Sequence, residues 1–282
     1  MVKETNYVKD TFPEYLGKKD HISASDIKNF LKSPKYYYWN KYLKKEKDEG
    51  RHFAIGSALH EMIMEPHLFN SNYIVMPKVD KRTKEGKLLY ENFLIQAEGK
   101  TMLDNEEMEM ITQMVTNATE NKTFMSLLEN SHRELSAYLI DEKTGLKLKM
   151  RPDILCQTKS TIVDIKSCLD SAPKQFKSNV YSYGYSLSAA FYSDFLEREN
   201  YIFAAIEKSQ PYQTSLYALS DEMMEYGRTQ YRLGLDLLKW SYDNNYWCDH
   251  NEFEILKECR ELENLEQFFE INELSTKITI LQ

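Results

Sequence analysis

Two carboxylates and a lysine stand close together in one short stretch of the chain, KLKMRPDILCQTKSTIVDIKS at 147–167. Asp153 follows a proline, and Asp164 precedes Lys166 by two positions. Carboxylates held side by side repel each other, and a divalent cation relieves that repulsion because hard cations prefer oxygen ligands. A bound cation can polarise a phosphoryl oxygen and lower the pKa of a water, and the lysine can orient that water. The three residues therefore predict a hydrolytic site for a phosphodiester.

The alternation of side chains along a strand explains how these groups would meet. In the strand expected at 146–155, one face carries the charged side chains, namely Lys147, Lys149, Arg151 and Asp153. In the strand expected at 161–167, Asp164 and Lys166 share one face, and the apolar residues share the other. A hairpin of the two strands would bring Asp153 beside Asp164 and Lys166. An isolated D-x-K pattern is common by chance, and its ordinary alternative is a pair of solvated strand residues.

The elements around this hairpin define the expected fold. Further strands are predicted at 134–140, 201–208 and 212–219, with a long helix at about 173–197. Helical regions are predicted at 21–66, at about 103–129 and from 220 onward. Strand 201–208 is apolar on both faces, which is typical of a central strand. We therefore expect an α/β fold with a central mixed sheet flanked by helices and a helical N-terminal region.

Composition and charge limit the possible classes of protein. The chain has 282 residues, 42% of them apolar, which suits one folded domain. We expect that domain at 1–250 with its core at about 134–219, and an acidic tail at 251–282 that either contacts a partner or a second subunit or is a plain solvated helix. The net charge of −8 arises from residues 220–282, so the remainder can still present a basic face to a polyanion.

The apolar segments indicate the cellular compartment, and the spacing of the cysteines indicates their redox state. No apolar run approaches the roughly 20 residues that span a bilayer, and the N-terminus lacks a signal-peptide core. We therefore expect a cytoplasmic protein that does not contact a membrane. Four cysteines stand at 156, 168, 248 and 259 without a C-x-x-C pair, and reduced thiols are the expected state.

Four segments in order resemble the C-terminal nuclease domain of exonuclease VIII (RecE-type), a member of the PD-(D/E)xK nuclease superfamily. They are SASDIKNFLKSPKYYYW at 23–39, GSALHEMIMEP at 56–66, KMRPDIL with IVDIKS within 149–167, and YSYGYSLSAAFYSDF at 181–195. The resemblance covers roughly residues 20–250. It implies a PD-(D/E)xK restriction-endonuclease-like core and a place among phage and prophage recombination exonucleases.

The resemblance assigns roles to the residues of the first motif and to one histidine. It implies that Asp153 and Asp164 are metal ligands, that the backbone carbonyl of Ile165 completes the site, and that Lys166 is the catalytic lysine. It also implies that His60 is a second-site metal ligand or a phosphate contact. Without the resemblance, His60 would be interpreted as a surface histidine, because it lies off the buried stripe of its helix.

Three further residues are accessory candidates. The resemblance matches Tyr192 to the tyrosine of the family's Q-x-x-x-Y helix, and Ser188 stands where that motif has glutamine. Serine is shorter, so the DNA-contact role of this helix is the part placed in doubt. The stripe of Tyr181, Tyr185, Ser188 and Tyr192 would lie along one long helix. Glu134, on the first predicted strand, approaches the site in this interpretation.

Basic residues offer candidate contacts to phosphates, which position DNA without reading its sequence. The candidates are Arg151 and a basic loop at 78–87 that holds Lys78, Lys81, Arg82, Lys84 and Lys87. A second cluster comprises Lys41, Lys44, Lys45, Lys47 and Arg51. The alternative for both groups is an ordinary solvated surface. The aromatic run at 36–39 has helical spacing, which favours core packing over base stacking.

The resemblance also implies an activity and partners. It implies an Mg²⁺-dependent exodeoxyribonuclease with two ions, for which Mn²⁺ substitutes, that digests linear double-stranded DNA from 5′ to 3′. The remaining 3′ single strand would serve annealing-type recombination with a single-strand annealing protein. A homo-oligomeric ring around DNA is expected, a tetramer rather than a trimer.

Two alternatives follow from the same motif. Some nucleases of the superfamily carry an iron–sulfur cluster, which needs four cysteines bracketing the core, and this chain has none before Cys156. A catalytically silent nuclease fold that binds DNA or protein is the second alternative. It predicts the loss of a metal ligand or of the lysine, but Asp153, Asp164 and Lys166 are all present.

Overall fold

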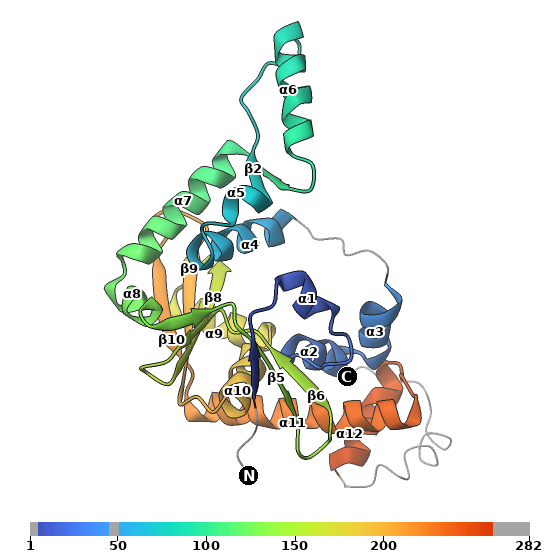
Figure 1. The fold of residues 1–282 in the computed structure, drawn as a ribbon. Coiled ribbons are helices and arrows are strands. Elements are labelled where there is room, and N and C mark those ends of the chain that lie inside the picture. Colours follow the sequence, from blue (N-terminus) through green and yellow to red (C-terminus); the bar gives the residue numbers. More distant parts are fainter. Residues whose placement is uncertain (1–4, 45–50, 262–282) are drawn as a thin grey trace.

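The computed structural model describes residues 5–44 and 51–261, and a five-stranded mixed sheet lies at its centre (Figure 1). Its strands run in the order β10 (Thr214–Ala218), β9 (Asn200–Glu207), β8 (Thr161–Cys168), β7 (Ile154–Cys156) and β4 (Ser131–Arg133). β8 and β9 are parallel, and the other neighbours are antiparallel. A second sheet holds β1 (Asn6–Val8), β5 (Ser136–Ile140) and β6 (Lys147–Met150). The predicted α/β fold with a mixed sheet is confirmed.

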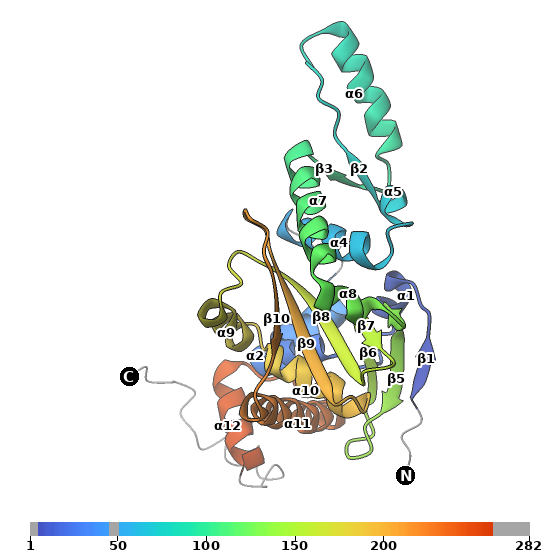
Figure 2. The same ribbon diagram turned by 90° about the vertical axis from the view of Figure 1, so that its left-hand side faces the viewer.

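Helices cover both faces of the central sheet (Figures 1 and 2). One face carries α2 (Ala24–Lys32), α9 (Pro173–Ser182), α10 (Tyr185–Phe195), α11 (Asp221–Asn244) and α12 (His250–Glu261). The other face carries α4 (Arg51–Met64), α7 (Asn105–Glu120) and α8 (Lys122–Leu128). Ile162 of β8 is buried in the hydrophobic core on the first of these faces, whereas Val163 and Ile165 are buried in the core on the other face. The alternation predicted for this strand is therefore present, and Asp164 and Lys166 point to the side of α10.

The helices begin where the sequence supplies caps. Ser23 and Asp26 form a capping box that starts α2, as their spacing predicted. Ser33 and Pro34 then start α3 (Pro34–Tyr38), which runs into a π-helical turn at Trp39–Leu43. Of the aromatic run, Tyr37 is buried, but Tyr36 and Trp39 are exposed. Core packing therefore accounts for only part of that run.

Three predicted elements are shortened or broken, each for a local reason. The helix expected at 173–197 is split into α9 and α10, because Gly184 takes a left-handed conformation with φ 62°. The strand expected at 134–140 begins only at Ser136, as β5, because Glu134 has φ 52° in the gap that separates β5 from β4. The strand expected at 146–155 is interrupted at 151–153, between β6 and β7, at the Pro-Asp of the motif.

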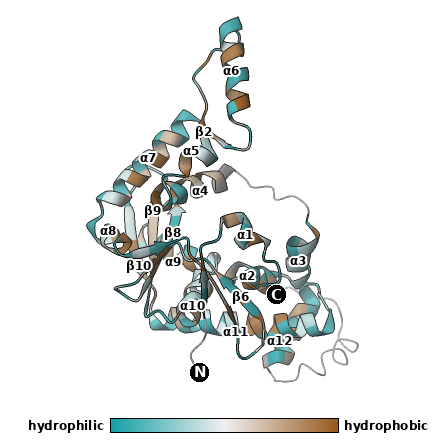
Figure 3. Ribbon diagram, in the orientation of Figure 1, coloured by the Kyte–Doolittle hydropathy of each residue, from teal (hydrophilic) through white to brown (hydrophobic). Residues whose placement is uncertain are grey.

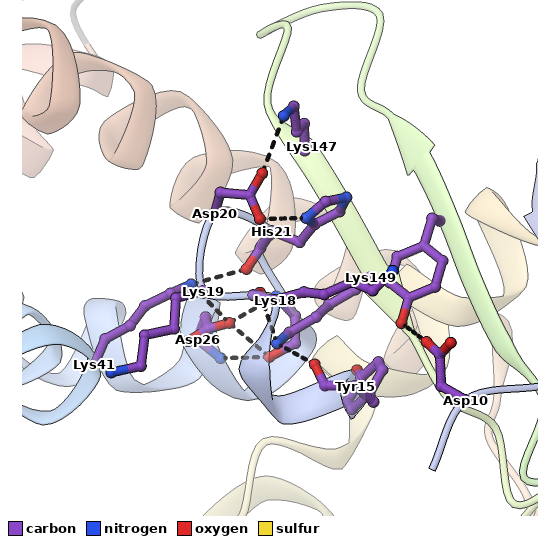
Figure 4. Close-up of polar contacts among 12 residues, drawn as sticks. Asp10, Tyr15, Lys18, Lys19, Asp20, His21, Asp26, Lys41, Lys147 and Lys149 are labelled. Atoms are coloured by element: carbon purple, nitrogen blue, oxygen red, sulfur yellow. Dashed lines mark hydrogen bonds and ion pairs between the residues drawn. The ribbon is translucent and has the colours of Figure 1, made fainter. Parts of the chain in front are cut away.

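The N-terminal segment covers the charged face of β6 (Figure 4). Lys149 is buried, and its Nζ donates to the carbonyls of Tyr15 and Lys18 at 2.9 and 3.0 Å, at the end of α1 (Phe12–Gly17). Lys41 Nζ lies 3.1 Å from Asp26 Oδ2, and the Lys41 side chain is 7% exposed. Lys41 therefore anchors this segment and is not available to bind phosphate, contrary to the sequence-based expectation. Lys45 and Lys47 lie outside the described residues.

An arm projects from the body beyond α4 and α7 (Figures 1 and 2). It consists of α5 (Phe69–Asn72), two parallel strands, β2 (Tyr73–Val75) and β3 (Thr101–Leu103), and the intervening α6 (Lys84–Gln96). The basic loop predicted at 78–87 is therefore partly wrong, because Thr83 caps α6 and places Lys84 and Lys87 in a helix. Figure 3 shows hydrophobic residues along α6. The exposed ones are Leu88, Leu89, Leu94 and Ile95.

The C-terminal part of the described chain belongs to the body. Phe253, Leu256 and Cys259 of α12 are buried in the same core as α2 and α11. The folded body thus continues past the boundary expected at 250, and residues 262–282 of the acidic tail lie outside the described residues. All four cysteines are buried and unpaired. Among the described helices, none combines the length and apolar character that a membrane span needs.

Candidate active site

The hairpin of β7 and β8 brings the two predicted carboxylates and the lysine together. β7 and β8 pair in antiparallel register, with Ile154 opposite Val163. The register places Asp153 next to the backbone of Ile165, whose N–H donates to Asp153 Oδ2 at 2.7 Å. Lys166 Nζ lies 2.5 Å from Asp164 Oδ1 on the same face of β8.

α4 adds a histidine to this cluster from the other side of the sheet. A Cβ at Gly56 would lie only 3.5 Å from Ser167 Oγ, so α4 runs directly against the end of β8. One turn later, His60 Nε2 lies 3.0 Å from the Ile165 carbonyl oxygen. A carbonyl can only accept, so Nε2 carries the proton in this contact and Nδ1 is left with its lone pair. That Nδ1 faces Asp153 Oδ2 at 3.5 Å.

The protonation of the cluster reflects burial and crowding of like charges. Burial, and then the neighbouring Asp164, raise the pKa of Asp153 well above its usual value. Burial opposes ionisation of Asp164 too, but the Lys166 ammonium holds the pKa of Asp164 below its usual value. Burial, together with the charge of Lys166, lowers the pKa of His60 to about 4. His60 is therefore neutral near pH 7, which is the form that binds metals.

The donor set fits a divalent cation. His60, Glu134 and Asp153 each offer a ligand atom, and these atoms lie within 4.8 Å of one another. His60 Nδ1 and Asp153 Oδ2 both present lone pairs, so a shared proton or a cation is needed to hold them face to face. Carboxylate oxygens with one imidazole suit Mg²⁺ or Mn²⁺. A cation here would also offset the repulsion between Asp153 and Asp164.

The comparisons with known proteins agree with this geometry. Residues 23–260 match a family model described as a PDDEXK-like domain of unknown function (DUF3799). The chain belongs to this PDDEXK-like family. Nucleases with this motif use divalent metals, and the fold supports hydrolytic nuclease chemistry. No curated protein matches the chain significantly.

A solved structure shares the fold of this PDDEXK-like domain. A crystal structure from Eubacterium rectale, provisionally named an exonuclease, has a TM-score of 0.60 at 13% identity, and the match covers 87% of this chain and 91% of that one. A phage related exonuclease from Haemophilus somnus 129PT matches at 11% identity with a TM-score of 0.34, covering 80% of this chain and 96% of that one. At such identities the first likeness supports the fold alone.

Arg151 has a different place from the one expected. Its side chain is 6% exposed, and Nε lies 2.7 Å from Glu134 Oε2. Its Nη1 donates to the Asp10 carbonyl at 2.8 Å and to Ser136 Oγ at 3.1 Å. The prediction that Arg151 contacts DNA is wrong for this structure, because the guanidinium is enclosed. Arg151 instead holds Glu134 beside the metal-ligand candidates.

α10 presents the predicted accessory residues to the site. The Tyr192 hydroxyl accepts the backbone N–H of Arg151 at 3.3 Å, and burial raises the pKa of Tyr192. Ser188 is partly exposed, one turn from Tyr185 and from Tyr192 on the same stripe. Tyr181 is not on this stripe, because the break at Gly184 leaves it on α9.

Two residues near the site, Tyr201 and Lys28, were not predicted, and Tyr185 was named only as part of the helix stripe. The Tyr201 hydroxyl donates to Asp164 Oδ2 at 3.1 Å, and the Tyr185 ring centroid lies 5.3 Å from Lys166 Nζ. Lys28 of α2 lies near enough for the charge of Lys166, after burial, to lower the Lys28 pKa to about 8. Lys28 stands inside the segment at 23–39, so a signal for it existed. The sequence alone does not identify Tyr201 as part of the site, because its position depends on the pairing of β8 with β9.

The basic candidates of the segment 78–87 lie on the arm and not with the metal-ligand candidates (Figure 1). Lys78, Lys81, Arg82 and Lys84 are all exposed. Arg82 pairs with Asp80 at 2.9 Å, and Lys81 Nζ lies 3.3 Å from the Tyr90 ring centroid. The arm therefore carries a cationic tip that is separate from the site.

Proposed function

We propose that this PDDEXK-like domain is a metal-dependent exonuclease that digests linear double-stranded DNA. The observation that carries the proposal is the meeting of Asp153, Asp164 and Lys166 at the end of one hairpin, with His60 Nδ1 facing Asp153 Oδ2 at 3.5 Å. One side of this cluster offers ligands for a divalent cation, and the other side carries a positive charge. Phosphodiester hydrolysis uses both, because the cation activates a water and positive charge balances the charge that develops at phosphorus.

The residues divide the chemistry between them. A bound Mg²⁺ or Mn²⁺ would supply positive charge to the phosphoryl oxygen and lower the pKa of the attacking water. Asp153, Asp164 and the Ile165 carbonyl, with His60 and Glu134, are the groups that would hold one or two such ions. Lys166 is kept protonated, because Asp164 and Asp153 raise its pKa against the effect of burial. Its ammonium orients the water and balances the charge that develops at phosphorus.

The arrangement of supporting groups keeps this cluster in place. Tyr201 donates to Asp164 Oδ2, which leaves Asp164 Oδ1 directed at Lys166. His60 donates to one lone pair of the Ile165 carbonyl, and the second lone pair of that oxygen remains for a cation. Hydrolysis adds one water across a P–O bond, and these residues supply no covalent intermediate.

We also propose finer features, supported by the resemblance of the four segments to RecE-type exonucleases. These are digestion from 5′ to 3′, a 3′ single strand left for annealing-type recombination in a phage or bacterial cytoplasm, and Mg²⁺ as the ion with Mn²⁺ substituting. They also include a homo-oligomeric ring, a tetramer in preference to a trimer, and a single-strand annealing protein as partner.

The test uses end-labelled linear duplex and closed circular duplex, each with Mg²⁺ or EDTA. We expect nucleotide release from the linear DNA only, only with Mg²⁺, and reduced by about 10²-fold or more in Lys166→Ala, the effect of losing one group that stabilises charge in the transition state. Lys147→Ala is the matched control, since this exposed lysine of β6 makes only a surface ion pair with Asp20.

Each alternative gives a different result. Cutting of the closed circle would replace the exonuclease with an endonuclease. DNA binding without any cleavage would support the catalytically silent nuclease fold. The position of the label on the released nucleotide decides the polarity.

A further inference from the structure

An exposed tyrosine stands at the break between α9 and α10. Tyr183 is 60% exposed, although a side chain as large as tyrosine is usually at least half buried in a folded domain. The turn that carries it is closed by two backbone hydrogen bonds, from the Tyr183 N–H to the Asn179 carbonyl at 2.9 Å and from the Gly184 N–H to the Tyr181 carbonyl at 3.2 Å. The ring of Tyr183 is therefore presented to solvent on a fixed backbone.

This tyrosine is connected to the candidate active site through one other ring. The ring centroids of Tyr183 and Tyr185 lie 5.6 Å apart with an interplanar angle of 35°. The Tyr185 centroid lies 5.3 Å from Lys166 Nζ, and Tyr185 stacks on Phe203 of β9. Tyr183 is thus the outermost of a row of rings that starts in the core and passes beside Lys166.

Lys28 braces the turn from below. A Cβ at Gly184 would lie 3.0 Å from Lys28 Cδ, so the lysine stem packs against this glycine. Its Nζ donates to the Tyr183 carbonyl at 3.4 Å. Gly184 itself has φ 62°, a conformation that glycine adopts without strain. A lysine, a glycine and a hydrogen-bonded turn together fix an aromatic ring that gains little from burial.

We propose that Tyr183 is a binding residue whose ring stacks on a nucleobase of the strand being cut, next to the scissile phosphate held at Lys166. This inference rests on the proposed nuclease function and adds a contact to the same site. Every base has a π face, so stacking on an aromatic side chain tolerates any sequence, as a nuclease of general DNA requires. The row of rings ends at the surface, where a base unpaired from its partner can reach it.

The test measures stacking without cleavage. An oligonucleotide with 2-aminopurine at the terminal position binds the protein in Ca²⁺ or EDTA, and stacking quenches its fluorescence. We expect quenching with the wild-type protein and with Tyr183→Phe, which keeps the ring. We expect loss of quenching and an about tenfold weaker affinity with Tyr183→Ala. Tyr36→Ala is the matched control, a similarly exposed tyrosine on α3.

Cleavage kinetics supply a second readout. Tyr183→Ala should raise KM by about tenfold with kcat within about twofold, because the ring binds substrate and does not touch the reacting atoms. Unchanged quenching in Tyr183→Ala, or loss in Tyr36→Ala instead, would overturn the proposal. If the wild-type protein cleaves no DNA but its quenching depends on Tyr183, the proposed activity fails while the stacking contact stands.

Discussion

The contact between Glu134 and Arg151 shows which part of the site follows from the local sequence pattern and which part depends on tertiary contacts. Strand alternation was enough to predict that Asp164 and Lys166 share a face, since period two follows from the backbone alone. The same rule put Arg151 on the face of Asp153, but the strand is interrupted at 151–153 and the two side chains have different partners. What the rule could not supply is the segment around Asp10, which accepts from the Arg151 guanidinium and encloses it. That segment is distant in sequence, so an arginine expected at the surface became the support of Glu134.

The pKa of Asp153 leads to a prediction for stability. Its carboxyl has a pKa raised by burial and by Asp164, so the metal-free folded protein keeps a proton that the unfolded chain releases above about pH 4. The contribution of Asp153 to the free energy of unfolding in EDTA should therefore be fully present below that pH and be lost as the pH rises through the raised pKa. Asp164, whose pKa is lowered by Lys166, stabilises fully above about pH 4 and loses that effect only on acidification.

Saturating Mg²⁺ should reverse this trend, because the cation binds the deprotonated carboxylate. We expect the Tm gained on adding Mg²⁺ to increase from about pH 5 to pH 8, measured by thermal denaturation in EDTA and in Mg²⁺. Asp153→Asn should have no such pH dependence and little response to Mg²⁺. A Tm gain that is the same at every pH, or that survives in Asp153→Asn, would show that the cation binds elsewhere.

At the scale of elements, two glycines decide how α11 packs. The amphipathic pattern from residue 220 onward predicted the helix and its buried side. It did not show that Gly227 lies against α10 and Gly234 against Ile27 of α2. A glycine inside a helical pattern usually argues against a helix at that place. Here each of the two glycines marks a position where two helices approach closely. The break at Gly184 was the opposite case, since a glycine inside the predicted long helix was itself the signal.

The contact at Gly227 can be tested directly. A Cβ there would lie 2.1 Å from the Ser186 carbonyl oxygen, which is a backbone atom, so α10 and α11 would have to move apart. We expect Gly227→Ala to lower the free energy of unfolding by about 1–3 kcal/mol, measured by urea denaturation. Activity should fall as well, because α10 carries Tyr185 and Tyr192.

The control is Gly17→Ala at the end of α1. A Cβ at Gly17 would meet nothing within 4 Å, so its effect should stay within about 0.5 kcal/mol. Equal effects of the two substitutions would mean that helix propensity, and not the approach of α10 to α11, governs this position.

At the scale of the whole molecule, the arm is the part that the sequence described least well. The four segments that resemble RecE-type exonucleases all lie outside residues 73–103. α6 buries only Gly86 and Phe93 although apolar residues run along much of it, so its hydrophobic pattern does not show which side packs against the rest of the chain. The cap at Thr83 was the usable signal for its start. The body, by contrast, follows from periodicity, because the long strands β8 and β9 and the long helix α11 each bury a full face.

The arm's cationic tip leads to the last prediction. Lys78 and Lys84 are exposed on the arm, and we expect the pair Lys78→Glu and Lys84→Glu to weaken DNA binding. If each lysine neutralises one phosphate, the slope of log affinity against log salt should fall by about two. Glutamate at position 84 stands in the first turn of α6, where a negative charge stabilises a helix, so a loss of binding would not reflect unfolding.

The matched control is Lys239→Glu with Lys257→Glu on α11 and α12, at the opposite end of the molecule in Figure 1. An unchanged salt slope in the arm variant, or an equal fall in the control, would show that the arm lysines do not bind the DNA phosphates.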